Sequence, residues 1–167
     1  MAMKNTQRGF ALLIAVIFMA VMLSFGLALG SLSYKQQILA SASVQSQYAF
    51  YAADAGLECA LYYDQKQNNF DYISHDGTTH PNPIICDGAT ADELPAPDGY
   101  SYNASRLLVK QRVGIDSGKR CVDVTVYKMS DGQTYIFSQG YDVSCATVAA
   151  AAPNGARFVS RGINIHY

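Results

Sequence analysis

Four cysteines are the residues of this 167-residue chain whose type and number point to covalent chemistry: Cys59, Cys86, Cys121 and Cys145. An even number of cysteines without a Cys-x-x-Cys pair favours disulfides in an oxidising compartment over a zinc knuckle or a redox motif. Three connectivities are possible. We favour Cys59–Cys86 and Cys121–Cys145, because the first closes a short loop after a long helix and the second brackets a predicted hairpin.

Histidine and acidic side chains between residues 64 and 105 could act as metal ligands. His75, Asp76 and His80 offer nitrogen and oxygen donors close together in sequence. A second group of carboxylates could bind calcium. Its members are Asp87, Asp92, Glu93 and Asp98. They lack the Asp-x-Asp-x-Asp-Gly spacing of a calcium loop, and solvated loop residues are the simpler interpretation of both groups. We therefore predict no metal site, with calcium binding left open.

Motifs of the common catalytic classes are missing from the sequence. It has no Gly-x-Ser-x-Gly, His-Glu-x-x-His or phosphate-loop pattern, and its single serines and histidines have no placed partner. We predict that the chain is not an enzyme and needs no cofactor.

The formal net charge of −1 hides an asymmetry, because acidic side chains predominate in residues 35–98 and basic ones in residues 99–167. Opposite charge can attract the two halves within one subunit or between neighbours. The basic side chains that could instead touch DNA phosphates are Arg106, Lys110, Arg112, Lys119, Arg120 and Lys128. A solvated sheet face or a contact with the acidic region is the simpler interpretation, so we do not expect nucleic acid as a partner.

An apolar segment dominates the N-terminal part of the chain. Lys4 and Arg8 precede it, and no charged side chain occurs from Gly9 to Tyr34. About 20 apolar residues at 1.5 Å each cross a ~30 Å hydrocarbon core, so residues 10–34 are predicted to span a membrane. The basic flank places the N-terminus in the cytoplasm and the rest outside it. Small residues at the end of the segment could also imitate a secretory cleavage site, and that alternative stays open.

Residues 35–63 continue this helix with one apolar face. The residues of the stripe are Ile38, Ala42, Ala49, Ala53, Ala60 and Tyr63, widened by Phe50, Leu57 and Leu61. Their spacing of three, four and seven residues is that of an amphipathic helix. Residues 64–105 then read as an irregular connection dense in turn residues. It contains either a short strand around Pro83–Cys86 or a surface loop held by a disulfide.

Residues 106–167 predict an antiparallel sheet of about four strands. Valines alternate with polar residues from Val122 to Tyr127, Asp131-Gly132 marks a hairpin, and Phe158–Tyr167 forms the last strand. Gly140 is interpreted as a bulge on a strand that continues to Cys145. Turn residues follow at Pro153-Asn154-Gly155. The amphipathic half of the helix is the only candidate cover for the sheet, so the fold class is α+β.

The Arg8-Gly9-Phe10 junction followed by this two-part helix resembles a type IV prepilin. The resemblance implies a leader of residues 1–9, cleavage between Gly9 and Phe10 by a prepilin peptidase, N-methylation of Phe10, and the pilin fold. Most pilins have a glutamate at the fifth mature position, which here is Ile14. In that departure, and in the alanine-rich segment Gln47–Glu58, the chain resembles PilX-type minor pilins. The K-type pseudopilin of type II secretion also lacks the glutamate but has a much larger head.

The resemblance implies a structural subunit of a type IV pilus or a related pseudopilus, involved in filament assembly, initiation or adhesion. Its partners would be other pilin subunits, the inner-membrane assembly platform, the peptidase and the membrane. The precursor would cross the inner membrane once with an extracytoplasmic head, and the mature chain would join a cell-surface filament. Two alternatives remain at this point: a major pilin, and a membrane-anchored extracytoplasmic binding domain that never polymerises.

Overall fold

The computed structural model of the chain describes residues 6–75, 77–95, 99–154 and 158–167. The chain divides into two compact units, Met1–Ala42 and Ser43–Tyr167, and each contains part of one long helix, α1 (Thr6–Gln67). No proline occurs before residue 81, so nothing in the sequence breaks this helix. It ends where Asn68 adopts a left-handed conformation with φ of 50°, which is common after the last helical residue.

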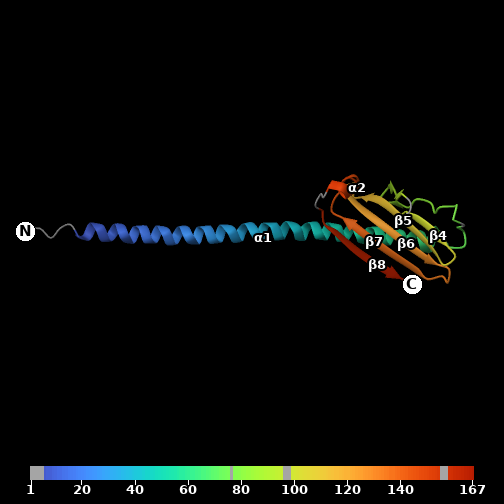
Figure 1. The fold of residues 1–167 in the computed structure, drawn as a ribbon, viewed down its shortest axis with the longest axis horizontal. Helices are drawn as coiled ribbons and strands as arrows, with labels where there is room; N and C mark the ends of the chain where they lie inside the picture. Colours follow the sequence, from blue (N-terminus) through green and yellow to red (C-terminus); the bar gives the residue numbers. More distant parts are fainter. Residues whose placement is uncertain (1–5, 76, 96–98, 155–157) are drawn as a thin grey trace, which may run out of the picture. The chain divides into compact units, whose positions relative to one another are not determined.

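The second unit contains a six-stranded antiparallel sheet (Figure 1). Its strands are β3 (Asp92–Glu93), β4 (Tyr100–Asn103), β5 (Arg106–Ile115), β6 (Arg120–Met129), β7 (Thr134–Tyr141) and β8 (Ser160–His166). The order is β3-β5-β6-β7-β8, and β4 also pairs with β5. A separate two-stranded ladder joins β1 (Ile85–Cys86) to β2 (Ala89–Thr90), and a short helix, α2 (Cys145–Asn154), lies between β7 and β8 in sequence.

The core of this unit lies between one face of the sheet and residues 49–60 of α1. Alternate residues of β5 are buried, and register places them beside the inward valines of β6. The buried apolar side chains of the strands are Leu107, Val109, Val113, Val122, Val124, Val126 and Ile136. Those of the helix include Ala52, Leu57 and Ala60. The predicted α+β fold, with a long N-terminal helix packed on an antiparallel sheet, is confirmed.

The four strands expected in residues 106–167 are present as β5 to β8, and the preceding region adds two more. β3 and β4 pair with β5, so residues 64–105 extend the sheet instead of only connecting it. The short strand expected near Pro83–Cys86 is β1.

Three details of the prediction are wrong. Gly140 pairs with Val122 in an unbroken register, so β7 has no bulge there. The strand ends at Tyr141, and Cys145 begins α2. Pro153 and Asn154 belong to α2 rather than to a turn, while Gly155 lies outside the described residues.

The buried face of α1 is also narrower than the predicted apolar stripe, and it begins further along the helix. Ile38 and Ala42 are exposed, and so is Phe50, whereas Asp64 is buried. In α1, burial begins at Ala49, where the helix meets β7.

Candidate functional site

The apolar segment of α1 is the first candidate site. Phe10–Gln67 is the one helix among the described residues that is long and apolar enough to cross a membrane. Its most apolar window of 18 residues has a mean hydropathy of 2.8, and none of that window is buried within the chain. Large side chains such as Met19 are exposed throughout it. Apolar surface of this extent needs lipid or other apolar helices around it, which is consistent with a single-pass membrane anchor.

The Gly9–Phe10 junction lies near the beginning of α1. Phe10 is 66% exposed, and Ile14, one turn further along the helix, is about half exposed. Farther along the apolar segment, Gly26 and Gly30 have no atom within 4 Å of the position a Cβ would take. The helix surface is therefore flat and open at these two glycines, four residues apart.

A close contact between α1 and β7 positions the second candidate site, which lies wholly within Ser43–Tyr167. A Cβ at Gly140 would lie 2.2 Å from the carbonyl oxygen of Ala49 and 2.3 Å from the amide nitrogen of Ala53. The Ser138 hydroxyl donates to the carbonyl of Ala53 at 2.7 Å. Small residues on both elements therefore fix the distance between helix and sheet.

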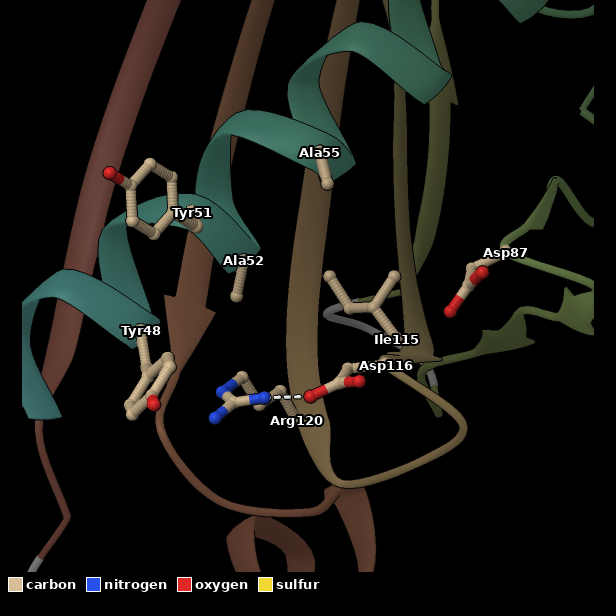
Figure 2. A pocket seen from close by; sticks show the side chains of 8 residues that line it. All are labelled: Tyr48, Tyr51, Ala52, Ala55, Asp87, Ile115, Asp116 and Arg120. Atoms are coloured by element: carbon tan, nitrogen blue, oxygen red, sulfur yellow. Dashed lines mark hydrogen bonds and ion pairs between the residues drawn. The ribbon is translucent and has the colours of Figure 1, made fainter.

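Beside this contact a groove of about 390 Å³ runs between α1 and the tip of the β5–β6 hairpin (Figure 2). Its residues are Tyr48, Tyr51, Ala52, Ala55, Asp87, Ile115, Asp116 and Arg120. Figure 2 shows the first four on the helix, with Arg120 lying between Tyr48 and Asp116 and with Asp87 on the neighbouring loop. The volume is within the range of small-ligand sites.

Arg120 organises the charge of the groove. Its guanidinium lies 3.8 Å from the centre of the Tyr48 ring and forms an ion pair with Asp116. The Nε of Arg120 is buried and has no hydrogen-bond partner among the described residues. The Asp87 carboxylate accepts from the Ser117 amide at 3.3 Å. This arrangement can hold an apolar side chain against the helix and a charged group at the rim.

Two disulfides hold the second unit together. Cys59–Cys86 joins α1 to β1, and Cys121–Cys145 joins β6 to α2. This is the favoured one of the three connectivities. The second disulfide places α2 against a small cluster that includes Tyr141 and Val148.

Three basic residues of strands β5 and β6 form ion pairs within the chain. Arg112 donates to the buried Asp123 at 2.6 and 2.8 Å, and Lys128 lies 2.9 Å from the buried Asp64 of α1. Arg120 belongs to the groove. The Lys128–Asp64 pair is a contact between the basic and acidic regions of the sequence, within one chain.

Two tyrosines donate hydrogen bonds to the buried carboxylates of Asp123 and Asp64. The Tyr141 hydroxyl donates to Asp123 at 3.1 Å, and burial followed by the Asp123 charge raises the pKa of Tyr141 to about 12. The Tyr167 hydroxyl donates to Asp64 at 2.5 Å, and burial, then this hydrogen bond, raises its pKa well above the usual value. The bonds to Asp64 join the sheet to α1, whereas those to Asp123 join strands β5, β6 and β7 to one another.

The acidic residues considered for calcium are not brought together. Asp87 lies in the β1–β2 turn, Asp92 and Glu93 form β3, and Asp98 lies outside the described residues, as does Asp76. No group of three or more His, Cys, Asp or Glu side chains among the described residues could hold a metal ion. Glu93 instead accepts from His80.

The sequence analysis did not predict this groove, although it named Asp87 as a calcium candidate and Arg120 as a DNA-contact candidate. Tyr48 and Tyr51 are three residues apart on α1, a spacing that places them on one helix face, and this was the available signal. Their neighbour Arg120 comes from a hairpin 69 positions away from Tyr51, and only the fold brings it near.

Comparison of the chain with models of protein families, with curated proteins and with solved structures finds no match.

Proposed function

We propose that this chain is a structural subunit of a type IV pilus or a related pseudopilus, and specifically a minor subunit of the PilX type. The continuity of α1 carries the proposal. One helix joins an apolar segment, whose most apolar 18 residues are not buried by the described part of the chain, to a second half whose alanine-rich face packs on an antiparallel sheet. A subunit that passes from a membrane into a helical bundle needs both halves in one helix.

Assembly requires that the apolar segment exchange lipid for other helices. Because lipid tails are as apolar as leucine, this transfer depends on close packing rather than on the hydrophobic effect. Gly26 and Gly30 leave open helix surface four residues apart, which permits close approach of a second helix. The partners in this proposal are other pilin subunits, the assembly platform of the inner membrane and the prepilin peptidase.

The minor-subunit assignment rests on Ile14. A carboxylate in the bilayer is costly, so a glutamate at the fifth mature position implies a use, such as pairing with the N-terminal amine of a neighbour. With isoleucine at this position the chain does not need that pairing. A subunit at or near the filament tip has fewer neighbours to pair with.

The mature N-terminus tests the proposal. After co-expression with a prepilin peptidase, mass spectrometry should find a chain that begins with N-methylated Phe10. Gly9→Ala or Gly9→Val should leave the precursor in the membrane, because the peptidase cuts after this glycine. Gly26→Ala is the matched control and should be processed normally, since its Cβ enters open space. Retention of Met1 or Ala2 in the presence of an active peptidase would contradict the prepilin assignment.

Sheared surface filaments distinguish the kinds of subunit. A minor pilin should be present in them at a small fraction of the principal subunit, and its deletion should reduce the number of filaments. A chain that is itself the principal component would be a major pilin instead.

The second candidate is a membrane-anchored extracytoplasmic binding domain that does not polymerise. The groove between α1 and the β5–β6 hairpin favours it, because this apolar hollow with a charged rim could hold a ligand in a single subunit. This function predicts an unprocessed N-terminus and no chain in sheared filaments.

A further inference from the structure

β8 lies at one edge of the six-stranded sheet, because β7 is its only partner in the described strand order (Figure 1). The two strands pair at every position of β8 from Ser160 to His166, without a bulge. Five of the seven residues of β8 are exposed. An edge strand has a row of backbone N–H and C=O groups without strand partners, to which a further strand can bind.

The pairing with β7 determines which backbone groups of β8 point away from the sheet. Thr134 and Tyr167 exchange two backbone hydrogen bonds, at 2.8 and 3.1 Å. Bonded and non-bonded pairs alternate along an antiparallel ladder, so Arg161, Ile163 and Ile165 also direct their backbone groups to β7. The residues between these three direct their backbone groups outward. They are Ser160, Gly162, Asn164 and His166.

β8 has none of the features that usually prevent an edge strand from binding another strand. It contains no proline, its pairing has no bulge, and it is longer than the shortest strands of the sheet. Arg161 is its single arginine or lysine. The Nε of Arg161 donates to the Ser46 hydroxyl of α1 at 2.7 Å, so this side chain extends over the helix and does not block the edge.

The opposite edge of the sheet, formed by β3 and β4, is contacted by the loop that follows α1. His80 of this loop donates to Glu93 of β3 at 2.9 Å, and its ring stacks on Tyr100 of β4 with centroids 3.9 Å apart. The Tyr72 hydroxyl donates to the backbone carbonyl of Asn103 in β4 at 2.8 Å. Among the described strands, β8 is therefore the edge that a further strand can reach.

A hollow of about 280 Å³ adjoins β8. Tyr135 and Phe137 of β7 line it, together with Asn164 and His166 of β8. Because Ser138 bonds to α1, the residues on either side of it in the alternation of β7 lie on the other face of the sheet. The hollow is thus on the face that points away from α1. A residue paired with Asn164 on an added strand would direct its side chain to this same face.

We propose that β8 binds an extended, acidic segment of a partner protein as a further antiparallel strand. The partner residue paired with Asn164 exchanges both backbone hydrogen bonds with it and directs an aromatic or large apolar side chain toward the hollow. The residues before and after it lie opposite Ile165 and Ile163, where β-branched side chains fit. A carboxylate three positions further along the partner lies opposite Arg161.

Charge favours such a partner over a second copy of the chain. β8 contains Arg161 and His166 but no acidic residue, so a second β8 would bring no carboxylate to Arg161. The acidic residues at the other edge of the sheet, Asp92 and Glu93 of β3, lie where the loop after α1 makes its contacts. A partner that supplies its own carboxylate therefore fits β8 better than this chain does.

A labelled peptide with the sequence Thr-Val-Phe-Val-Thr-Glu tests the proposal by fluorescence anisotropy, with the full-length chain in detergent micelles. Its phenylalanine is designed to pair with Asn164 and its glutamate with Arg161. N-methylation of the phenylalanine amide should weaken binding at least about tenfold, because it removes the donor to the Asn164 carbonyl and places a methyl group between the strands. Both peptides enter empty micelles alike, so the difference between them measures binding to the chain.

Exchange of charge tests the register. Arg161→Glu should weaken binding of the glutamate peptide about two- to fivefold, as loss of an exposed ion pair does, and should bind better a peptide with lysine in place of glutamate. Lys119→Glu is the matched control, because this exposed residue lies at the tip of the β5–β6 hairpin, and it should bind both peptides as the parent does.

Hydrogen exchange identifies the bound strand residue by residue. The peptide should slow exchange of the amides of Gly162, Asn164 and His166, while those of Ile163 and Ile165 are already protected by β7. Equal binding of the N-methylated peptide would overturn the proposal, as would unchanged exchange at the three outward amides. Protection of these amides that rises with protein concentration in the absence of peptide would place a second copy on β8 and would also overturn it. None of these outcomes bears on the processing of Gly9, so the proposed function is tested separately.

Discussion

Gly140 determines how closely α1 approaches the sheet. Any Cβ there would meet backbone atoms of Ala49 and Ala53, which cannot turn aside as a side chain can. We expect Gly140→Ala to lower the free energy of unfolding by about 1–3 kcal/mol or more, as overpacking does. Gly114→Ala is the control, because its Cβ would lie 3.4 Å from the nearest atom, an ordinary contact. Denaturant titration of both variants measures the difference, and equal stabilities would show that the helix shifts freely.

Tyr141 makes stability depend on pH in the alkaline range. Its folded-state pKa of about 12 exceeds the ordinary value of 10.0, so the neutral hydroxyl is favoured in the folded chain. The resulting stability is fully present below about pH 10 and is lost as the pH rises through about 12. Over this range, the unfolding free energy of Tyr141→Phe should fall less steeply than that of the parent. Tyr135→Phe, at an exposed position, should leave the slope unchanged, and an unchanged slope in Tyr141→Phe would contradict the assignment.

At the scale of elements, α2 depends on its disulfide. It joins the sheet through Cys121–Cys145 and a small cluster that includes Val148. We expect replacement of both cysteines by serine to cost about 2–4 kcal/mol and to speed hydrogen exchange of α2 amides more than those of β5. The matched comparison is the Cys59–Cys86 double variant, which should leave the protection of α2 intact. Equal protection of α2 in all three chains would contradict this dependence.

The longer elements could be predicted from sequence because their patterns repeat. α1 has no proline, and β6 alternates valine with polar residues over enough positions to fix its faces. β3 has two residues and β4 has four, too few for alternation to be recognised among turn residues. α2 is rich in alanine, so its sequence does not show which face of a helix would be buried. The proline near its end suggested a turn.

The candidate site was less predictable than the fold. Many residues of the α1 stripe are alanine, and which alanines are buried depends on where along the helix the sheet begins. Ala42 and Ala49 are alike in the sequence, yet only Ala49 meets β7. Arg120 enters the groove because the hairpin tip reaches the helix, a long-range contact that no local pattern encodes.

For the whole molecule, the apolar segment should determine attachment to the membrane. Arginine near the centre of a spanning helix costs about 2.5–3.5 kcal/mol of apparent insertion free energy. We expect Met19→Arg to show a loss of this size in a glycosylation-reporter insertion assay. Phe50→Arg, exposed on α1 within the second unit, should insert as the parent does. Equal losses in both variants would show that residues 10–34 are not the inserted segment.

The contacts between α1 and the last strands set an order for folding. Ser138 binds Ala53 across 85 positions, Tyr167 binds Asp64 across 103, and Arg161 binds Ser46 across 115. A chain synthesised from its N-terminus therefore exposes the sheet-facing side of α1 long before β7 and β8 exist to cover it. Contacts of such sequence separation also close slowly. Cys59 and Cys86, by contrast, emerge early and can pair while most of the sheet is still untranslated, so the first covalent link of the head can precede its core.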